Sequence, residues 1–376
     1  MTAIVVTLNR ADCVVRCLDA LAVQDSAVDQ VVVVDASTDP VHRRRTLEAV
    51  ERYAGPGEAT CVRNEAGYGH MTQSRNLGLE RATGEVIAFL DDDAFARPRW
   101  SAALLDTYRR RPDLGGMGGR AVRHERQLSE PVNPRQTRIG VLRRDGMIGG
   151  AWTVDCGREL DVEHLQGCNM SFRRSVLAEL GGLRDEYPGP EVREETDLCL
   201  RVRRLGYPLV YNPRAVVVHI GAPKPEGSRF DFGYEYFARR NHVYLLIRNF
   251  GLGPLLWRYL LSSAAMDLRL YAGQVRRSRG RSRGRSLPAS AWGLVTTQRG
   301  KLVGLAVGAI KRWRCGLDPV RRDAIGQRLA RRLAPASGDA AGHAAAQEPR
   351  LPIDRDADAP PQHPETTAEE PARAVG

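Results

Sequence analysis

Short apolar runs alternate with stretches of helical spacing over the first 90 residues of this 376-residue chain. The runs span residues 3–8, 31–34, 59–63 and 86–90, and the third of them is the weakest. Runs of this length are typical of strands buried on both faces, whereas the spacing of Val14, Leu18 and Leu21 indicates an amphipathic helix. Strands that alternate with helices predict βαβ units and a mostly parallel sheet. We therefore expect an α/β fold with a Rossmann-like sheet flanked by helices.

The fourth run, Val86–Leu90, leads directly into three carboxylates at positions 91–93. The carboxyl ends of parallel strands lie at one edge of a sheet, so these acids should lie near Thr7 and Asp35, where open α/β sheets bind ligands. Three adjacent carboxylates repel one another, and a divalent cation that holds a diphosphate would offset their charge. A solvated acidic turn is the alternative interpretation, because Asp favours turns.

Residues 97–219 predict further elements of the same kind. We expect helices at 97–110, 175–180 and 194–205, strands at 114–122, 167–174 and 215–219, and a mobile polar loop at 125–145. The last of these apolar runs ends at His219, so an imidazole also follows a predicted strand.

The remainder of the chain differs in character. Residues 234–271 are amphipathic, residues 276–286 alternate Arg with Ser and Gly, and residues 292–313 return to helical spacing. From about residue 334 the composition is rich in Ala, Pro, Asp and Glu, as in disordered segments. We divide the chain into an α/β domain (1–230), an amphipathic helical extension (231–275), an Arg-rich linker (276–290), a basic amphipathic helical segment (291–332) and a disordered tail (333–376).

The net charge of +11 is concentrated in one segment. Residues 276–332 contain 16 Lys and Arg against two acids, whereas residues 333–376 are acidic and residues 1–275 are nearly neutral. This distribution argues against a nucleic-acid-binding domain at the front of the chain. Because no uncharged apolar run reaches the length of about 18 residues, we expect no membrane-spanning helix.

Seven cysteines are scattered along the chain, and no two form a CxxC pair. This pattern favours free thiols in a reducing compartment over a disulfide framework. The first strand is expected to begin near Ala3 with no basic stretch before it, so we expect no signal peptide and a cytoplasmic location.

The order of these features resembles that of inverting family 2 glycosyltransferases of the GT-A fold. The resemblance covers roughly residues 3–220, and the stretches that carry it are 5–10, 33–39, 75–79, 83–93, 167–174, 194–201 and 213–219. Two stretches depart from the family pattern. Glu194 and Glu195 stand where the family usually has Glu-Asp, and the motif at 35–39 is one residue shorter than the common Asp-Asn-Gly-Ser form.

The resemblance implies roles for particular residues. The nucleotide sugar would be bound by Thr7, Arg10, Asp35, Asn64, Arg75, Asp91 and Asp92. A divalent cation, Mn²⁺ or Mg²⁺, would be held by Asp91, Asp93 and His219. The catalytic base would be Glu195, with Glu194 beside it. The acceptor side would include Asn169 and Arg173.

Structural roles compete with several of these assignments. Thr7 and Asp35 could cap strand ends, and a single His at a strand end, such as His219, is often structural. Acids in a first helical turn, such as Glu194 and Glu195, are favoured by the helix dipole.

The implied reaction moves a hexosyl or deoxyhexosyl group from a UDP, dTDP or GDP sugar to a glycan, lipid-linked or secondary-metabolite hydroxyl. A lipid-linked acceptor would suit a peripheral position at an anionic membrane surface, on which the C-terminal helices could lie. Packing of those helices on the α/β domain or on a partner is equally compatible with the sequence. Nucleic acid is not an expected partner. The sequence does not identify the sugar, nucleobase, acceptor or linkage.

Two other functions compete with glycosyl transfer. A sugar-phosphate nucleotidyltransferase also uses a Rossmann-like sheet, but it would need a Gly-rich loop after the first strand, and Leu8–Asp12 contains no Gly. A basic adaptor that binds membrane or nucleic acid would leave the acids at the strand ends unexplained.

Overall fold

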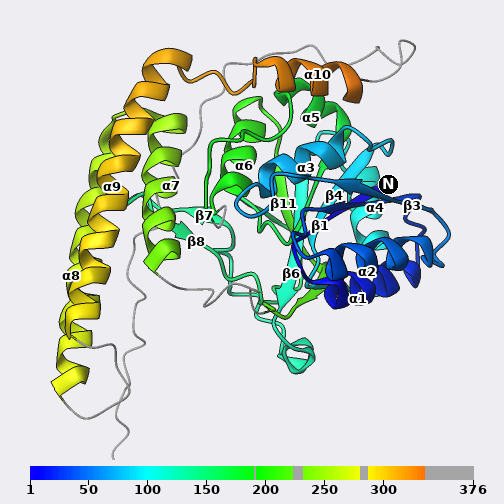
Figure 1. The fold of residues 1–376 in the computed structure, drawn as a ribbon, viewed down its shortest axis with the longest axis horizontal. Helices are drawn as coiled ribbons and strands as arrows, with labels where there is room; N and C mark the ends of the chain where they lie inside the picture. The colour runs from blue at the N-terminus through cyan, green and yellow to red at the C-terminus, as the bar shows by residue number, and fades with distance from the viewer. Residues whose placement is uncertain (190–191, 223–231, 280–286, 335–376) are drawn as a thin grey trace, which may run out of the picture.

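The computed structural model describes residues 1–189, 192–222, 232–279 and 287–334. A central mixed sheet carries helices on both faces, and a layer of long helices stands beside it (Figure 1). The predicted α/β class, with a central sheet flanked by helices, is therefore confirmed.

Nine strands of the described residues form the main sheet, in the order β3-β2-β1-β4-β10-β6-β11-β5 with β9 paired to β11. Their bounds are β1 Thr2–Thr7, β2 Gln30–Asp35, β3 Glu58–Arg63, β4 Val86–Asp91, β5 Ala94–Ala96, β6 Gly116–Val122, β9 Leu160–Asp161, β10 Asn169–Arg173 and β11 Leu209–His219. The first four strands are parallel, as the alternation of apolar runs and helices predicts. β10 lies antiparallel between β4 and β6, and the short strand β5, which the sequence did not indicate, pairs antiparallel with β11.

Alternating side chains of these strands build two separate cores. On one face, Val5, Val33 and Leu90 pack under α1 (Ala11–Ala22), α2 (Pro40–Glu51) and α4 (Trp100–Arg110). On the other face, Val34 and Phe89 pack under α3 (Met71–Leu79), α5 (Arg174–Leu180), α6 (Glu194–Arg204) and α10 (Ala324–Leu333). Full burial on both faces explains why these strands are apolar at nearly every position.

The segment predicted as a mobile loop at 125–145 contains local structure. It includes the 3₁₀ helix η1 (Glu125–Ser129) and strand β7 (Val141–Leu142), which pairs with β8 (Ile148–Gly149). Polar residues and the loss of a regular period concealed these short elements in the sequence.

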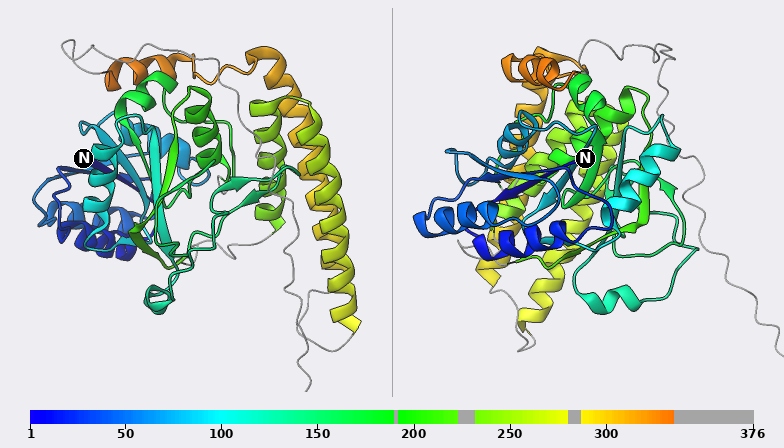
Figure 2. Two further views of the ribbon diagram at one scale, coloured as in Figure 1. Left: turned by 180° about the vertical axis from the view of Figure 1, so that it is seen from behind. Right: turned by 90° about the vertical axis from the view of Figure 1, so that its right-hand side faces the viewer.

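Three helices, α7 (Phe232–Phe250), α8 (Pro254–Arg279) and α9 (Leu287–Cys315), form the helical layer (Figures 1 and 2). α9 packs closely along α7 through three glycines one turn apart, Gly300, Gly304 and Gly308. A Cβ atom added at Gly304 would lie 2.6 Å from the backbone oxygen of Arg240, so only glycine permits this approach. α8 and α9 form the side of the layer away from the sheet (Figures 1 and 2).

The helical bounds correct the predicted Arg-rich linker at 276–290. α8 continues to Arg279 and α9 begins at Leu287, because the helical pattern persists on both sides of the Arg-rich sequence. Residues 280–286, and all of the predicted tail from residue 335 onward, lie outside the described residues. Among the described residues, each helix is too short or too polar to span a lipid bilayer, as the sequence predicts.

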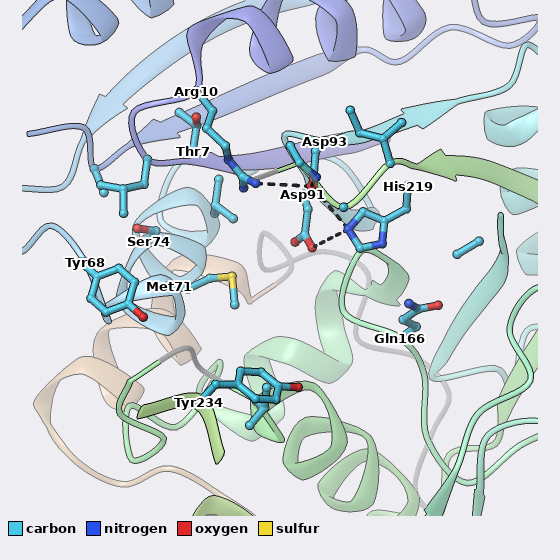
Figure 3. A pocket seen from close by; sticks show the side chains of 18 of the residues that line it. Thr7, Arg10, Tyr68, Met71, Ser74, Asp91, Asp93, Gln166, His219 and Tyr234 are labelled. Carbon is cyan, nitrogen blue, oxygen red and sulfur yellow. Dashed lines mark hydrogen bonds and ion pairs between the residues drawn. The ribbon is translucent and has the colours of Figure 1, made fainter. Parts of the chain in front are cut away.

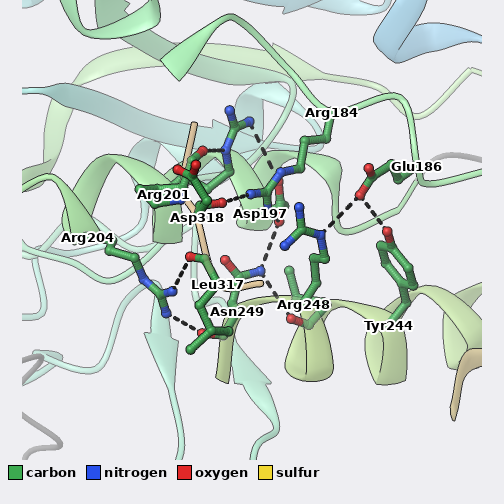
Figure 4. Close-up of polar contacts among 12 residues, drawn as sticks. Arg184, Glu186, Asp197, Arg201, Arg204, Tyr244, Arg248, Asn249, Leu317 and Asp318 are labelled. Carbon is green, nitrogen blue, oxygen red and sulfur yellow. Dashed lines mark hydrogen bonds and ion pairs between the residues drawn. The ribbon is translucent and has the colours of Figure 1, made fainter. Parts of the chain in front are cut away.

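After α9 the chain returns to the α/β domain. Leu329 and Leu333 of α10 are buried in the core beside α5. Between α9 and α10, backbone oxygens of Gly316, Leu317 and Pro319 accept hydrogen bonds from an arginine cluster, defined here as Arg184, Arg201, Arg204 and Arg248 (Figure 4). The backbone oxygen of Asp318 also accepts a bond from Arg184.

Candidate functional site

A cavity of about 640 Å³ opens where β1 and β4 end, between the sheet, the start of α3 and the start of α7 (Figure 3). The β-strand register explains this position. Thr7 pairs with Asp35 and Val6 pairs with Asp91, so the polar ends of three parallel strands lie at one edge. The predicted clustering of Thr7, Asp35 and the acids at this edge is confirmed.

β11, which lies beyond β10 and β6 in the sheet, ends at His219 and brings this residue to the same edge. β11 pairs with β5 so that His219 lies opposite Ala94, and the amide of Ile220 donates to the backbone oxygen of Asp93 at 3.1 Å. The imidazole Nε2 of His219 is 3.3 Å from Asp93 Oδ1 and 3.9 Å from Asp91 Oδ2 (Figure 3). One ligand atom from each of Asp91, Asp93 and His219 lies within 4.8 Å of the others.

The carboxylate of Asp93 is buried among positive and donor groups. Its Oδ2 accepts from the amide of Ala222 at 2.7 Å and lies 3.3 Å from Arg10 Nη1. Burial alone would raise the pKa of Asp93, but His219, Arg10 and the amide of Ala222 together lower it to about 2. Asp93 is therefore ionised at neutral pH, as a ligand of a cation must be.

The imidazole of His219 responds to the same charges. Burial alone would lower its pKa, but Cys168, Asp93 and Asp91 raise the pKa of His219 to about 11. These groups together favour a positive charge at this point, and a bound cation would supply that charge in place of the proton on His219. Two carboxylate oxygens and an imidazole nitrogen match the donor types of a divalent metal site, with carboxylate the better ligand for Mg²⁺ or Mn²⁺.

Asp92 has a different position from its two neighbours. Its side chain is fully buried, accepts from Thr7 Oγ1 at 2.7 Å and from Arg10 Nε at 3.1 Å, and does not line the cavity. Burial raises the pKa of Asp92 to about 7, although Arg10 opposes this effect. The expected contact of Asp92 with a nucleotide sugar is corrected, because Asp92 lies in the turn between β4 and β5 and its carboxylate faces Thr7 and Arg10 instead of the cavity. Asp92 instead fixes Arg10 and Thr7, which do line the cavity.

Arg75 also lies behind the cavity rather than in its wall. Its guanidinium is 1% exposed and pairs with Glu194 at 2.8 Å and with Asp91 at 3.3 Å. The backbone oxygen of Gly167 accepts from Arg75 Nη2 at 3.2 Å. Arg75 therefore connects the acidic end of β4 to the acid pair that begins α6.

The two glutamates of that pair differ in environment. Glu194 is buried and paired with Arg75, whereas Glu195 is partly exposed and accepts from the amide of Arg193 at 3.1 Å. A Cβ atom added at Gly167 would lie 3.2 Å from Arg75 and 3.7 Å from Glu195 Cβ, so Gly167 lies close to both side chains. Gln166 and Val192, close in sequence to these residues, line the cavity.

Asn169 and Arg173 are not positioned to bind an acceptor. Asn169 is buried, accepts from Trp100 and donates to two backbone oxygens. Arg173 pairs in register with Val86, at the start of β4, and donates to backbone oxygens at the end of α4 and beyond. Since β10 runs antiparallel to β4, its last residue lies at the edge opposite the cavity. The acceptor-side assignment of both residues is corrected.

Two further sequence candidates shape loops at the edge. Asp35 is 2% exposed and accepts from the amide of Ser37, and Asn64 donates to Ser74 Oγ at 2.9 Å. Neither lines the cavity, although the adjoining Ala36 and Ser74 do.

Sequence reasoning missed several residues of the cavity wall. They are Tyr68 before α3, Met71 at its start, Gln166, and Tyr234 of α7 (Figure 3), together with Trp152. Tyr234 is the least expected, because it belongs to the segment predicted as an extension of the α/β domain. Its place in the wall depends on tertiary packing, and the Gly-Tyr-Gly sequence at 67–69 is the one local signal of a loop that could approach a ligand.

Comparison with known proteins shows similarity to glycosyltransferases. The family model described as glycosyl transferase family 2 matches residues 2–181. The chain is 31% identical over 161 residues to a glucosyl-dolichyl phosphate glucuronosyltransferase of Haloferax volcanii, covering 40% of this chain and 47% of that protein. It is 25% identical over 213 residues to the succinoglycan biosynthesis protein ExoM of Rhizobium meliloti, covering 57% of this chain and 63% of that protein. The chain thus spans about half of the length of the first relative and less than two thirds of the length of the second.

The fold is shared with a solved glycosyltransferase. The crystal structure of GalNAc-T7 with UDP, GalNAc and Mn²⁺ matches 67% of this chain and 48% of that chain, with a TM-score of 0.53 and 15% sequence identity. At this identity the comparison establishes the GT-A type of fold and leaves the chemistry to be argued from the site.

Proposed function

Since the family model described as glycosyl transferase family 2 matches residues 2–181 of this chain, we propose that the protein transfers a sugar from a nucleotide-diphosphate sugar to an acceptor hydroxyl with inversion at the anomeric carbon. The observation that carries this proposal is the position of Asp91, Asp93 and His219 together in the wall of a cavity of about 640 Å³. A cavity of that size is typical of small-molecule and cofactor sites.

Asp91, Asp93 and His219 would hold a divalent cation, Mn²⁺ or Mg²⁺. When bound, the cation would act as a Lewis acid on the diphosphate oxygens and stabilise the charge of the leaving group. Arg10 lines the same cavity and would add a second positive charge beside the diphosphate, held in place by Asp92.

Glu195 would act as the general base that removes the proton of the attacking hydroxyl. It is the partly exposed member of the acid pair, and Arg75 engages the other member. In a one-step displacement the base acts on the side opposite the leaving group, which is why we propose inversion. The transition state would resemble the oxocarbenium ion of glycoside hydrolysis.

The donor would be a UDP, dTDP or GDP sugar, with a hexosyl or deoxyhexosyl group transferred. UDP is named with GalNAc-T7, which shares the fold. A lipid-linked or glycan acceptor is proposed by analogy with the Haloferax volcanii relative, whose name includes a dolichyl phosphate. Thr7, at the end of β1, and the loop that Asp35 and Asn64 shape would lie on the nucleotide side.

The decisive experiment is a screen of nucleotide sugars with the full chain, with and without Mn²⁺. We expect release of nucleoside diphosphate from one donor class, only when metal is present. Activity that consumes nucleoside triphosphate and sugar phosphate and releases pyrophosphate would instead identify a nucleotidyltransferase. Nucleotide binding that is equally strong with and without metal would contradict the proposed role of the acidic cluster.

A further inference from the structure

The helical layer carries two apolar stripes that no other described part of the chain covers. On α8, the residues Trp257, Leu261 and Leu268 are exposed, Leu261 by 75%. Their spacing of three to four residues, or its multiples, places them on one side of the helix. Residues of α8 that face inward, such as Leu256 and Tyr259, are buried against α7.

α9 shows the same arrangement over its whole length. Trp292, Leu302 and Trp313 are exposed, Trp313 by 85%. The opposite side of α9 carries Gly300 and Gly304, which contact α7. We call the six exposed residues Trp257, Leu261, Leu268, Trp292, Leu302 and Trp313 the outer helical face.

The charges on these two helices are of one sign. Between Pro254 and Cys315 the sequence contains thirteen Lys and Arg and a single acid, Asp267. That acid is buried in ion pairs with Arg239 and Lys301, so it offers no negative charge to a partner. Exposed cations, among them Arg258, Arg269, Arg299 and Arg314, flank the apolar stripes.

We propose that the outer helical face docks on the surface of an anionic lipid bilayer. Helices that lie in a membrane surface combine exposed Trp and Leu with flanking Lys and Arg, and they bind through apolar burial plus attraction to anionic lipid. Such helices do not cross the bilayer, which agrees with the absence of a spanning helix among the described residues.

The same features disfavour the other occupants. Two copies of this face would bring like charges together with no exposed acid on α8 or α9 to offset them. Nucleic acid would satisfy the arginines but would leave the six large apolar side chains without an apolar partner. Monomeric proteins rarely leave large apolar patches exposed, so a membrane remains the surface that matches both the stripes and the charges.

The helical layer also connects the outer helical face to the wall of the cavity. α9 runs in the same direction as α7, because Gly300 lies against Tyr236 and Gly308 against Ile247. Tyr234, at the start of α7, lines the cavity, and the described ends of α8 and α9 extend beyond that start (Figure 1). A lipid-linked acceptor would therefore approach along the helical layer; this last point alone rests on the proposed function.

The test is cosedimentation of the full chain with sucrose-loaded vesicles of phosphatidylcholine alone or mixed with phosphatidylglycerol. We expect binding to the mixed vesicles, weaker binding to the neutral ones, and loss of binding at high salt. Serine at Trp257, Leu261 and Leu268 together, or at Trp292, Leu302 and Trp313 together, should each weaken binding at least about tenfold. Removal of an exposed charge, as in Arg299→Gln, should weaken it about fivefold.

A matched control variant carries Val41→Ser and Leu47→Ser on α2, where both side chains are also exposed. This control should bind vesicles like the wild type, and circular dichroism should show all variants to be folded. Equal binding to both vesicle types, or no loss in either serine variant, would overturn the proposal. So would a wild-type dimer in sedimentation velocity that binds no vesicles and becomes a monomer in the α9 serine variant.

Discussion

Arg75 and Glu194 form an ion pair, with 2.8 Å between Nη1 and Oε1, in which both side chains are almost fully buried. The pair joins α3 to the start of α6, and the same guanidinium lies 3.3 Å from Asp91. A buried carboxylate that is held by arginine is poorly suited to accept a proton from a substrate. The pair therefore separates two adjacent glutamates that the sequence alone left equivalent, and it favours Glu195 as the base.

Replacement of Glu195 by Gln should lower turnover by about 10²–10⁴-fold, the usual contribution of a general base. Nucleotide affinity in the presence of Mn²⁺ should stay close to that of the wild type, because Glu195 does not line the donor cavity. Steady-state rates and isothermal titration with the nucleoside diphosphate measure the two effects separately. Turnover close to the wild-type rate would remove Glu195 from this role.

The Arg75–Glu194 pair should behave as a stabilising unit. Either Arg75→Met or Glu194→Leu removes the shortest ion pair of the buried charge that remains and should reduce the free energy of unfolding by up to about 3–5 kcal/mol. The double variant should lose less than the sum of the single variants, because no uncompensated charge from the pair remains. Urea unfolding of the wild type, the two single variants and the double variant gives the four free energies of unfolding that are compared. If the losses of the single variants add up to that of the double variant, the two residues are not coupled.

Asp93→Asn and His219→Ala should each weaken Mn²⁺-dependent nucleotide binding. Since both residues would bind the metal directly, the loss should exceed the roughly 10–100-fold change that follows from altering an outer partner of a metal ligand. Binding of nucleoside diphosphate is measured by titration at several Mn²⁺ concentrations. Asp106→Asn, an exposed acid on α4, is the matched control and should leave binding unchanged.

Acid should destabilise the protein partly through Asp197. Burial alone would raise the pKa of Asp197, but Arg184 and Arg201 outweigh it and lower the pKa below its ordinary value. The ionised carboxylate therefore stabilises the fold fully above the unfolded pKa of about 3.9, and this contribution is lost as the pH falls through the lower folded-state pKa. Asp197→Asn should cost about 3–5 kcal/mol at pH 7, because it leaves the buried guanidinium groups without their acid.

This deficit should shrink below about pH 4, where the carboxyl of the unfolded wild type begins to bind a proton while that of the folded protein is still ionised. Urea unfolding of the wild type and Asp197→Asn at neutral and acidic pH gives the comparison. A deficit that is the same at both pH values would mean that the carboxylate charge is not the source of the stabilisation.

The strands and their shared edge could be predicted because parallel strands that are buried on both faces appear in the sequence as continuous apolar runs. The runs at 3–8, 31–34 and 86–90 are apolar at nearly every position, and the polar residue that ends each one marks the edge. The three-residue strand β5 gives no such run, yet its pairing with β11 is what brings His219 beside Asp93. Sequence reasoning therefore placed His219 by family resemblance and not by physical derivation.

The site predictions that were wrong have a different cause. The type of a residue does not reveal the direction in which its side chain points. Asp92 has the same chemistry as Asp91 and Asp93, but it faces inward and holds Arg10. Arg173 carries a charge suited to a ligand, but the antiparallel direction of β10 takes it to the opposite edge. Tyr234 gave no local signal, because its role depends on how α7 packs.

The arginine cluster described above limits how the protein can be divided. Its guanidinium groups lie on α6, on α7 and in the loop before α6, yet their acceptors are backbone oxygens of residues 316–319, beyond the last long helix. A recombinant fragment that ended after β11 would lack the backbone oxygens that accept hydrogen bonds from these arginines. It would also expose the part of the core that Leu329 covers. The smallest fragment that folds on its own must therefore retain α10, and α7, α8 and α9 are an integral part of the same folded unit.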